Sequence, residues 1–288
     1  MFQVAFGMAI AKSNSITVEY VRINEPLIKR GKNARRNLDI RKFSLTKDLI
    51  VKNFGSIYYP RTFEKVLESQ CQEKTFAVFK ESDSLAKDIQ NCDAEVIGLE
   101  GYWQSEKYFK DAQSEILETF NSLAKVNSEY VNIERLIKQS KSRSIGIHVR
   151  RGDYISNMKT NKFHGVCSIT YFEEALKHLS KRVPESKVFI FSDDPEWARE
   201  NIVVPDWIVI SGQFGLHAAE ELLLLSNCSH LILSNSSFSW WGAYLRENRQ
   251  FPKPNIVAPS PWFADAKNPS PQLTHWYKLN IETGIHVL

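Results

Sequence analysis

SIGIHVRRGDY, residues 144–154, is the stretch from which the fold can be predicted. Its first half is apolar and β-branched at alternate positions, Ile145, Ile147 and Val149, which is typical of a buried strand. The polar residues Arg150, Arg151 and Asp153 follow directly. Two adjacent guanidiniums at the end of a buried strand are costly unless an anion meets them. Ligands of an open parallel sheet lie outside the carboxyl ends of its strands, so this turn is a candidate phosphate site.

The residue type supports that interpretation, because the planar fork of arginine makes paired, charge-assisted hydrogen bonds to phosphate. On these residues alone an alternative stays open, in which an Arg–Asp ion pair only ties down a loop. After a loop, a helix is expected to begin at Ser168 or Thr170.

Length and composition exclude several classes of protein. The 288 residues suffice for two domains, and 43% apolar with 24% charged residues is typical of a globular protein. The net charge of 37 − 33 = +4 permits an anionic ligand but does not indicate nucleic acid. The four cysteines and seven histidines are scattered without metal-type spacing, so we expect no metal site.

The sequence carries no apolar run of eighteen residues and no signal-peptide pattern, which predicts a cytoplasmic protein. The stretch from Lys29 to Lys42 is rich in lysine and arginine. It is either a solvated loop or a patch for peripheral contact with the inner membrane face or an anionic acceptor.

The second half of the chain alternates strand and helix about every 20 residues. Strands are predicted over 188–191, 207–210, 231–233 and 255–258, and helices over 170–182 and 238–247. This alternation favours a doubly wound parallel sheet. The polar, basic segment Lys138–Arg143 is a plausible boundary. We therefore expect one α/β domain over 1–143 and a second, Rossmann-like α/β domain over 144–288.

The first half has a weaker pattern. It predicts helices over 2–12, 109–123 and 131–139, and strands over 16–21, 75–79 and 95–99. The segment GYWQSEKYF, residues 101–109, places aromatic rings around polar side chains, which suits a sugar. Packing of those rings in a core is an equally good interpretation of the spacing.

Three polar turns follow predicted strands: HVRRGDY, SDDP and SNSS. If the strands are parallel, the turns share one edge of the sheet. The arginines could hold a diphosphate there, and Asp193 could accept hydrogen bonds from the edge of a base. Ser234–Ser237 and the N–H groups that open the next helix could bind phosphate oxygens. Alternatively, Asp194 and the serines only cap helices.

With these turns, the chain resembles the α-1,2-fucosyltransferases of glycosyltransferase family 11. The matching motifs are HVRRGDY at 148–154, FSDDPEW at 191–197 and NSSFSWWGAYL at 235–245. GYWQSEKYF is similar to the family's GYFQSEKYF, with Trp103 in place of phenylalanine. The family begins with a strand and a Gly-rich loop before MFQYAFG, whereas this chain begins at the corresponding methionine. The N-terminal half is therefore expected to lack that strand and loop.

The resemblance implies a GT-B-like fold of two Rossmann-like halves. It implies an inverting, metal-independent transfer of L-fucose from GDP-β-L-fucose to the 2-hydroxyl of a galactose-containing acceptor, without a cofactor. The residues implied in donor binding are His148, Arg150, Arg151, Asp193, Asn235, Ser236, Ser237 and Phe238. Within that set, Asp193 is expected to recognise guanine.

Catalysis without a metal would need fixed positive charge at the departing diphosphate, and Arg150 is the candidate. Asp153 and Glu106 are alternative general bases for the acceptor hydroxyl, and a dissociative transition state would need little help from either. Two other functions stay open. One is a GDP-sugar binder that has lost catalysis with its N-terminal loop, and the other is an anion- or nucleic-acid-binding α/β protein.

Overall fold

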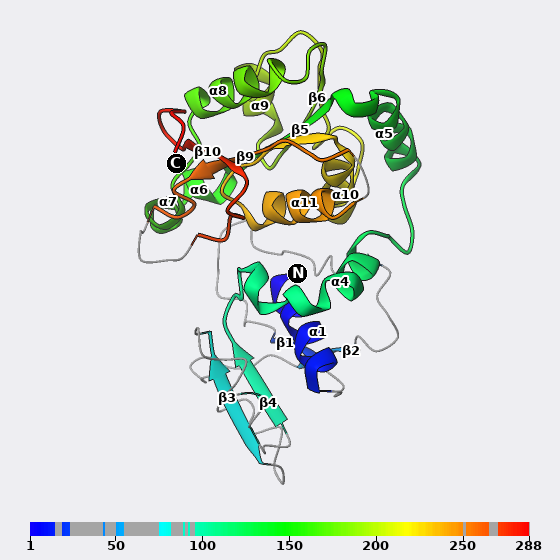
Figure 1. Cartoon of the computed structure of the whole chain (residues 1–288), viewed down its shortest axis with the longest axis vertical. Coiled ribbons are helices and arrows are strands. Elements are labelled where there is room, and N and C mark those ends of the chain that lie inside the picture. Colours follow the sequence, from blue (N-terminus) through cyan, green and yellow to red (C-terminus); the bar gives the residue numbers. More distant parts are fainter. Residues whose placement is uncertain are drawn as a thin grey trace. The chain divides into compact units, whose positions relative to one another are not determined.

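The structure is a computed structural model that describes residues 1–14, 19–23, 43, 50–54, 75–81, 89, 92, 96–249, 252–264 and 270–287. The chain divides into two compact units. The first comprises Met1–Leu38 and Leu45–Thr119, and the second comprises Asp39–Ser44 and Phe120–Leu288. Figure 1 shows the elements of each unit.

The described residues of the first unit include two pairs of parallel strands and several helices. Its strands are β1 (Glu19–Ile23) with β2 (Ile50–Phe54), and β3 (Phe76–Lys80) with β4 (Val96–Glu100). Its helices are α1 (Phe2–Asn14), η2 (Glu106–Tyr108), η3 (Lys110–Ala112) and most of α4 (Gln113–Phe120).

The aromatic motif at 101–109 contributes to the core of this unit. Trp103 is 1% exposed and stacks on Phe6 of α1, with ring centroids 4.4 Å apart. Phe109 is fully buried, whereas Tyr102 is 74% exposed. Core packing therefore accounts for Trp103 and Phe109, the half-buried Tyr108 packs edge-on against Trp103, and Tyr102 offers an exposed ring.

The second unit is built on one six-stranded sheet in the order β10-β9-β8-β5-β6-β7. Every neighbouring pair is parallel. The strands are β5 (Ser144–Val149), β6 (Lys187–Ser192), β7 (Trp207–Val209), β8 (His230–Ile232), β9 (Ile256–Ser260) and β10 (Tyr277–Asn280). All six residues of β5 are buried, because helices cover both faces of a central parallel strand.

Helices cover the two faces of this sheet, with α8 and α9 on one and α10 and α11 on the other (Figure 1). Their bounds are Ile169–Ser180 for α8, Pro195–Asn201 for α9, Ala218–Asn227 for α10 and Ser237–Glu247 for α11. The remaining helices are α5 (Ser128–Gln139), η4 (Lys141–Arg143), α6 (Gly152–Ser156) and α7 (Met158–His164). Side chains of α8, including Tyr171, Phe172 and Leu176, pack against β5 and β6 residues to form the core.

The predicted α/β, GT-B-like class is confirmed, since two compact units each carry parallel strands. The boundary predicted at residue 143 falls after α5, whereas the two compact units of the structure are divided after Thr119. The reason is that α5 packs on α10, where the Glu220 carboxylate accepts a hydrogen bond from the Asn127 N–H at 2.6 Å. The basic stretch 29–42 lies outside the described residues.

Candidate active site

The three polar turns meet at the carboxyl edge of the six-stranded sheet. Val149 at the end of β5 pairs in register with Ser192 at the end of β6, and Ile147 pairs with Ile232 of β8. The arginine turn therefore lies between the two other turns, as expected for parallel strands.

Arg150 is the centre of this edge. One of its terminal nitrogens lies 2.8 Å from an Asp193 oxygen, and the other donates to Asp153 at 2.5 Å. Its guanidinium also lies over the ring of Tyr154, 5.2 Å from the centroid. The side chain is 20% exposed, so it stays accessible to a ligand while two carboxylates fix its position.

Asp193 joins the first two turns. One of its oxygens pairs with Arg150, and the other accepts a hydrogen bond from the backbone N–H of Arg151 at 2.8 Å. Gly152 makes this contact possible, because a Cβ at that position would lie 2.4 Å from an Asp193 oxygen. The glycine of the motif is therefore required by close approach of the carboxylate.

The guanidinium of Arg151 is held less closely by carboxylates than that of Arg150. Its guanidinium carbon lies 3.8 Å from the centroid of the Trp197 ring, and its Nε is 3.6 Å from an Asp194 oxygen. That Nε is buried and has no hydrogen-bond partner in the described part of the chain. Asp194 also caps α9 by accepting from the Trp197 N–H, which confirms the capping interpretation of that residue.

His148 links the first turn to the third. Its Nδ1 lies 2.8 Å from the Ser234 hydroxyl, and its ring stacks on Phe238 at 4.8 Å. Burial, with a smaller effect of the nearby Arg150 charge, lowers the pKa of His148 to about 3. The imidazole is therefore neutral at pH 7, and it can contribute a hydrogen bond but not a charge.

The third turn is held by buried side chains. Asn235 is 1% exposed, and its amide donates to the carbonyls of His164 and Trp262 at 2.7 and 3.3 Å. The backbone carbonyl of Asn235 accepts a hydrogen bond from the Tyr154 hydroxyl at 3.1 Å. Ser236 caps α11 by accepting from the Phe238 N–H at 3.3 Å. Asn235 is thus a scaffold for the turn, and its side chain is not free to face a ligand.

The outer part of this turn is open. Ser237 is exposed and Phe238 is half-buried. Both lie in the first turn of α11, where helix N–H groups and the helix dipole favour an anion. The N-terminus of α11 matters for anion binding because the side chains of the arginine turn do not carry a net positive charge. The two guanidiniums face the carboxylates of Asp153, Asp193 and Asp194, so the formal charge of these five groups is +2 − 3 = −1.

The two candidate bases lie in different units. Asp153 is in α6 and pairs with Arg150, so one of its oxygens is engaged. Glu106 begins η2 in the first unit.

Glu221 is a carboxylate at this edge that the sequence analysis missed. It lies in the first turn of α10 and accepts a hydrogen bond from the Ser211 hydroxyl at 2.6 Å. Burial, with repulsion from Glu220, raises the pKa of Glu221 to about 7 despite that hydrogen bond. A strongly perturbed carboxyl at a ligand-binding edge is a functional candidate. In sequence it stands in AAEELLLL, where it resembles the polar face of an ordinary helix.

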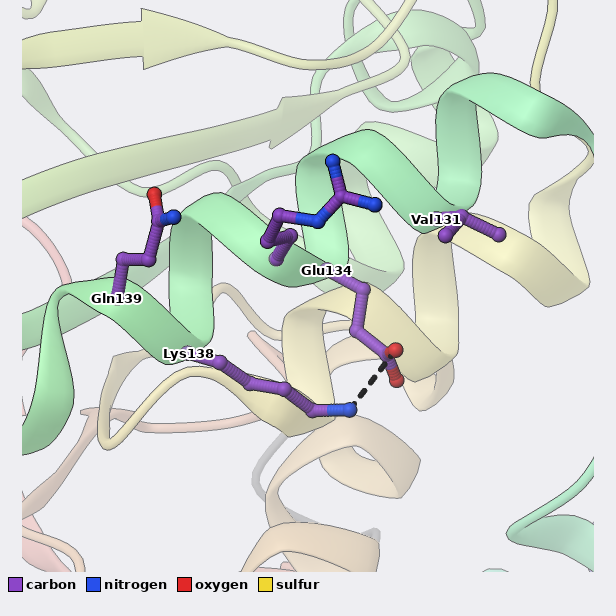
Figure 2. A pocket seen from close by; sticks show the side chains of 5 residues that line it. Val131, Glu134, Lys138 and Gln139 are labelled. Carbon is purple, nitrogen blue, oxygen red and sulfur yellow. Dashed lines mark ion pairs between the residues drawn. The ribbon is translucent and has the colours of Figure 1, made fainter.

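A separate hollow of about 380 Å³ lies on α5 (Figure 2). The described residues that line it all belong to α5, and Lys138 pairs with Glu134 across one helical turn. Since α5 ends shortly before β5 begins, the hollow lies toward the amino end of that strand, and we do not assign it to the site.

Two classes of feature were not found in the described residues. No group of three or more His, Cys, Asp or Glu side chains there could hold a metal ion. Nor does any described helix combine the length and apolar character needed to cross a membrane.

Comparison with known proteins identifies relatives. The family described as Glycosyl transferase family 11 matches residues 68–277, well over half of the chain. An alpha-1,2-colitosyltransferase of Escherichia coli is 31% identical over 185 residues, which cover 64% of this chain and 62% of the relative. The galactoside 2-alpha-L-fucosyltransferase SEC1 of Bos taurus is 32% identical over 170 residues, 57% of this chain and 46% of that protein.

A third relative is the O-antigen biosynthesis glycosyltransferase WbnK of Escherichia coli, 29% identical over 66% of this chain and 64% of its own length. The chain thus spans less than two thirds of the length of these relatives. Among solved structures, NodZ alpha-1,6-fucosyltransferase soaked with GDP-fucose aligns with a TM-score of 0.45 and 16% identity. That alignment covers 85% of this chain and 87% of NodZ.

Proposed function

Because the chain belongs to glycosyl transferase family 11, we propose that it is a galactoside α-1,2-fucosyltransferase. It would move L-fucose from GDP-β-L-fucose to the 2-hydroxyl of a galactose-containing acceptor, such as a glycan or O-antigen unit. The observation that carries the proposal is the meeting of Arg150, Arg151 and the N-terminus of α11 at one sheet edge.

The donor diphosphate would lie against Arg150, Arg151 and the exposed N-terminus of α11. Arg151 supports this placement, because its buried Nε has no hydrogen-bond partner in the described part of the chain. His148 would act as a neutral hydrogen-bonding group, since its pKa is lowered to about 3. Asn235 and Ser236 would shape the turn, and Ser237 and Phe238 would face the ligand.

In the proposed transfer, the bond between fucose C1 and the β-phosphate oxygen breaks and a bond from the acceptor oxygen to C1 forms on the opposite face. The acceptor proton goes to a base, and negative charge accumulates on GDP. Arg150, fixed by two carboxylates before the donor arrives, would stabilise that charge without a metal.

Either Asp153 or Glu106 would accept the acceptor proton. If Asp153→Asn and Glu106→Gln both keep full turnover, no carboxylate base of this kind is used.

The test is GDP-fucose turnover with a simple β-galactoside, with product linkage determined by NMR and with chelator added in parallel. We expect an α-1,2-linked product with and without chelator. Arg150→Lys should collapse kcat although the charge is kept, because the planar fork is lost. Binding of GDP without product would instead support a non-catalytic GDP-sugar binder.

Contact of the stretch 29–42 with anionic lipid stays a prediction, testable by co-sedimentation with anionic and neutral vesicles.

A further inference from the structure

Among the carboxylates at or beside the carboxyl edge, four each hold an arginine or a backbone N–H: Asp153, Asp193, Asp194 and Glu220. Asp193 holds Arg150 and the Arg151 N–H, and Asp194 caps α9 and approaches Arg151. Asp153 pairs with Arg150. Glu220 accepts from the His217 N–H at 2.8 Å and from the Asn127 N–H at 2.6 Å. These four act within the protein scaffold.

Glu221 differs from them. One of its oxygens accepts from the Ser211 hydroxyl, and its second oxygen accepts no hydrogen bond from the described residues. The residue is half-buried, so a ligand can reach it. A carboxylate oriented through one oxygen and open at the other can accept two N–H donors from a ligand.

Ser211 places Glu221 beside the second turn. Its hydroxyl also accepts a hydrogen bond from the Ser192 N–H at 2.9 Å, and the Ser192 hydroxyl in turn accepts from the Asp194 N–H at 2.9 Å. Ser211 therefore links the Glu221 carboxylate to the second turn, which carries Asp193 and Asp194.

We propose that Glu221, and not Asp193, is the carboxylate that recognises the donor base, by accepting hydrogen bonds from the N1–H and 2-amino group of guanine. This inference rests on the proposed function, because it assumes a guanine nucleotide on the arginine turn. Ser211 is the positioning residue, since it orients one Glu221 oxygen and leaves the other open.

Burial supports this assignment. Burial and the neighbouring Glu220 raise the pKa of Glu221 to about 7. In the absence of a ligand, the ionised form of this carboxyl is therefore destabilised at this position. Two charge-assisted hydrogen bonds from guanine would offset that cost. Asp193 has no comparable free oxygen, because Arg150 and the Arg151 N–H engage both.

The experiment measures binding of GDP and inosine diphosphate by isothermal titration calorimetry. Inosine diphosphate lacks only the 2-amino group, so the ratio of the two affinities isolates base recognition. The variants are Glu221→Gln, which keeps the size of the side chain, Glu221→Ala and, as matched control, Asp193→Asn. Circular dichroism confirms that each variant is folded.

We expect the wild-type protein to prefer GDP by ~10-fold or more, as one lost charge-assisted hydrogen bond implies. Both Glu221 variants should reduce that ratio to near one, whereas Asp193→Asn should weaken both nucleotides and keep the ratio. A ratio lost in Asp193→Asn and kept in Glu221→Gln would overturn the inference. Equal weakening of both nucleotides by Glu221→Gln would also overturn it, because the contact would then be to ribose. Failure of the wild-type protein to bind either nucleotide would contradict the proposed function itself.

Discussion

Replacement of Glu221 by glutamine should make the stability of the second unit less dependent on pH. The pKa of this carboxyl is ordinarily 4.5 and is raised to about 7 in the folded chain. The folded state therefore binds the proton more tightly than the unfolded state between these values. Glu221 therefore contributes to the free energy of unfolding at acidic pH, and this stabilising contribution is lost as the pH rises from 4.5 to about 7.

The magnitude follows from the two pKa values. Their difference corresponds to ~3 kcal/mol, of which about 2 to 3 kcal/mol should be lost between pH 5 and pH 8. Glutamine cannot ionise, so the stability of Glu221→Gln relative to wild type should rise by that amount over the same range. A constant offset from the altered bond to Ser211 does not affect this change.

Urea unfolding followed by tryptophan fluorescence provides the measurement. Of the seven tryptophans, only Trp103 lies in the first unit, so 7 − 1 = 6 report on the second. Glu115→Gln is a suitable control, because the pKa of that exposed carboxyl is lowered, chiefly by its hydrogen bond with Lys12. A relative stability of Glu221→Gln that is unchanged from pH 5 to pH 8 would show that this carboxyl is ordinary and would refute the reasoning.

Two other substitutions test the geometry of the arginine turn. Gly152→Ala places a methyl group 2.4 Å from an Asp193 oxygen, so Asp193 must move. The affinity for GDP should therefore fall ~10-fold or more while the chain stays folded. An unchanged affinity in a calorimetric titration would contradict the contact between Gly152 and Asp193. Asp153→Asn removes one of three carboxylates and weakens the pair at Arg150, so GDP should bind several-fold more tightly in the same assay. Weaker GDP binding by that variant would mean that the ion pair with Asp153 is needed to orient Arg150.

Much of the second unit could be predicted because its strands are short apolar runs that end in polar turns. Elements without such a pattern were missed. The residues of β10, YKLN, include no apolar run, and α6 with α7 carries the polar sequence GDYISNMKTNKFH, which we expected to form a loop. Neither segment could be assigned from periodicity, because tertiary packing decides its structure.

The site shows a similar limit. The meeting of three turns follows from parallel strands alone, so the sequence was sufficient to predict it. The partner of each carboxylate was not predictable, since the contacts of Asp193 with Arg150 and of Glu221 with Ser211 depend on the register of neighbouring strands and on the position of α10. Asp193 was expected to recognise guanine because it follows a strand, yet the structure engages both its oxygens with the arginine turn.

The central claim is that the guanidiniums at the end of β5 bind a nucleoside diphosphate, and the affinities of GDP and guanosine test it most directly. Calorimetric titration of both ligands into the wild-type protein and Arg150→Lys measures what the phosphates contribute. We predict that wild type binds GDP at least ~100-fold more tightly than guanosine, and that Arg150→Lys loses most of this difference. Equal affinities of GDP and guanosine for the wild-type protein would contradict the account.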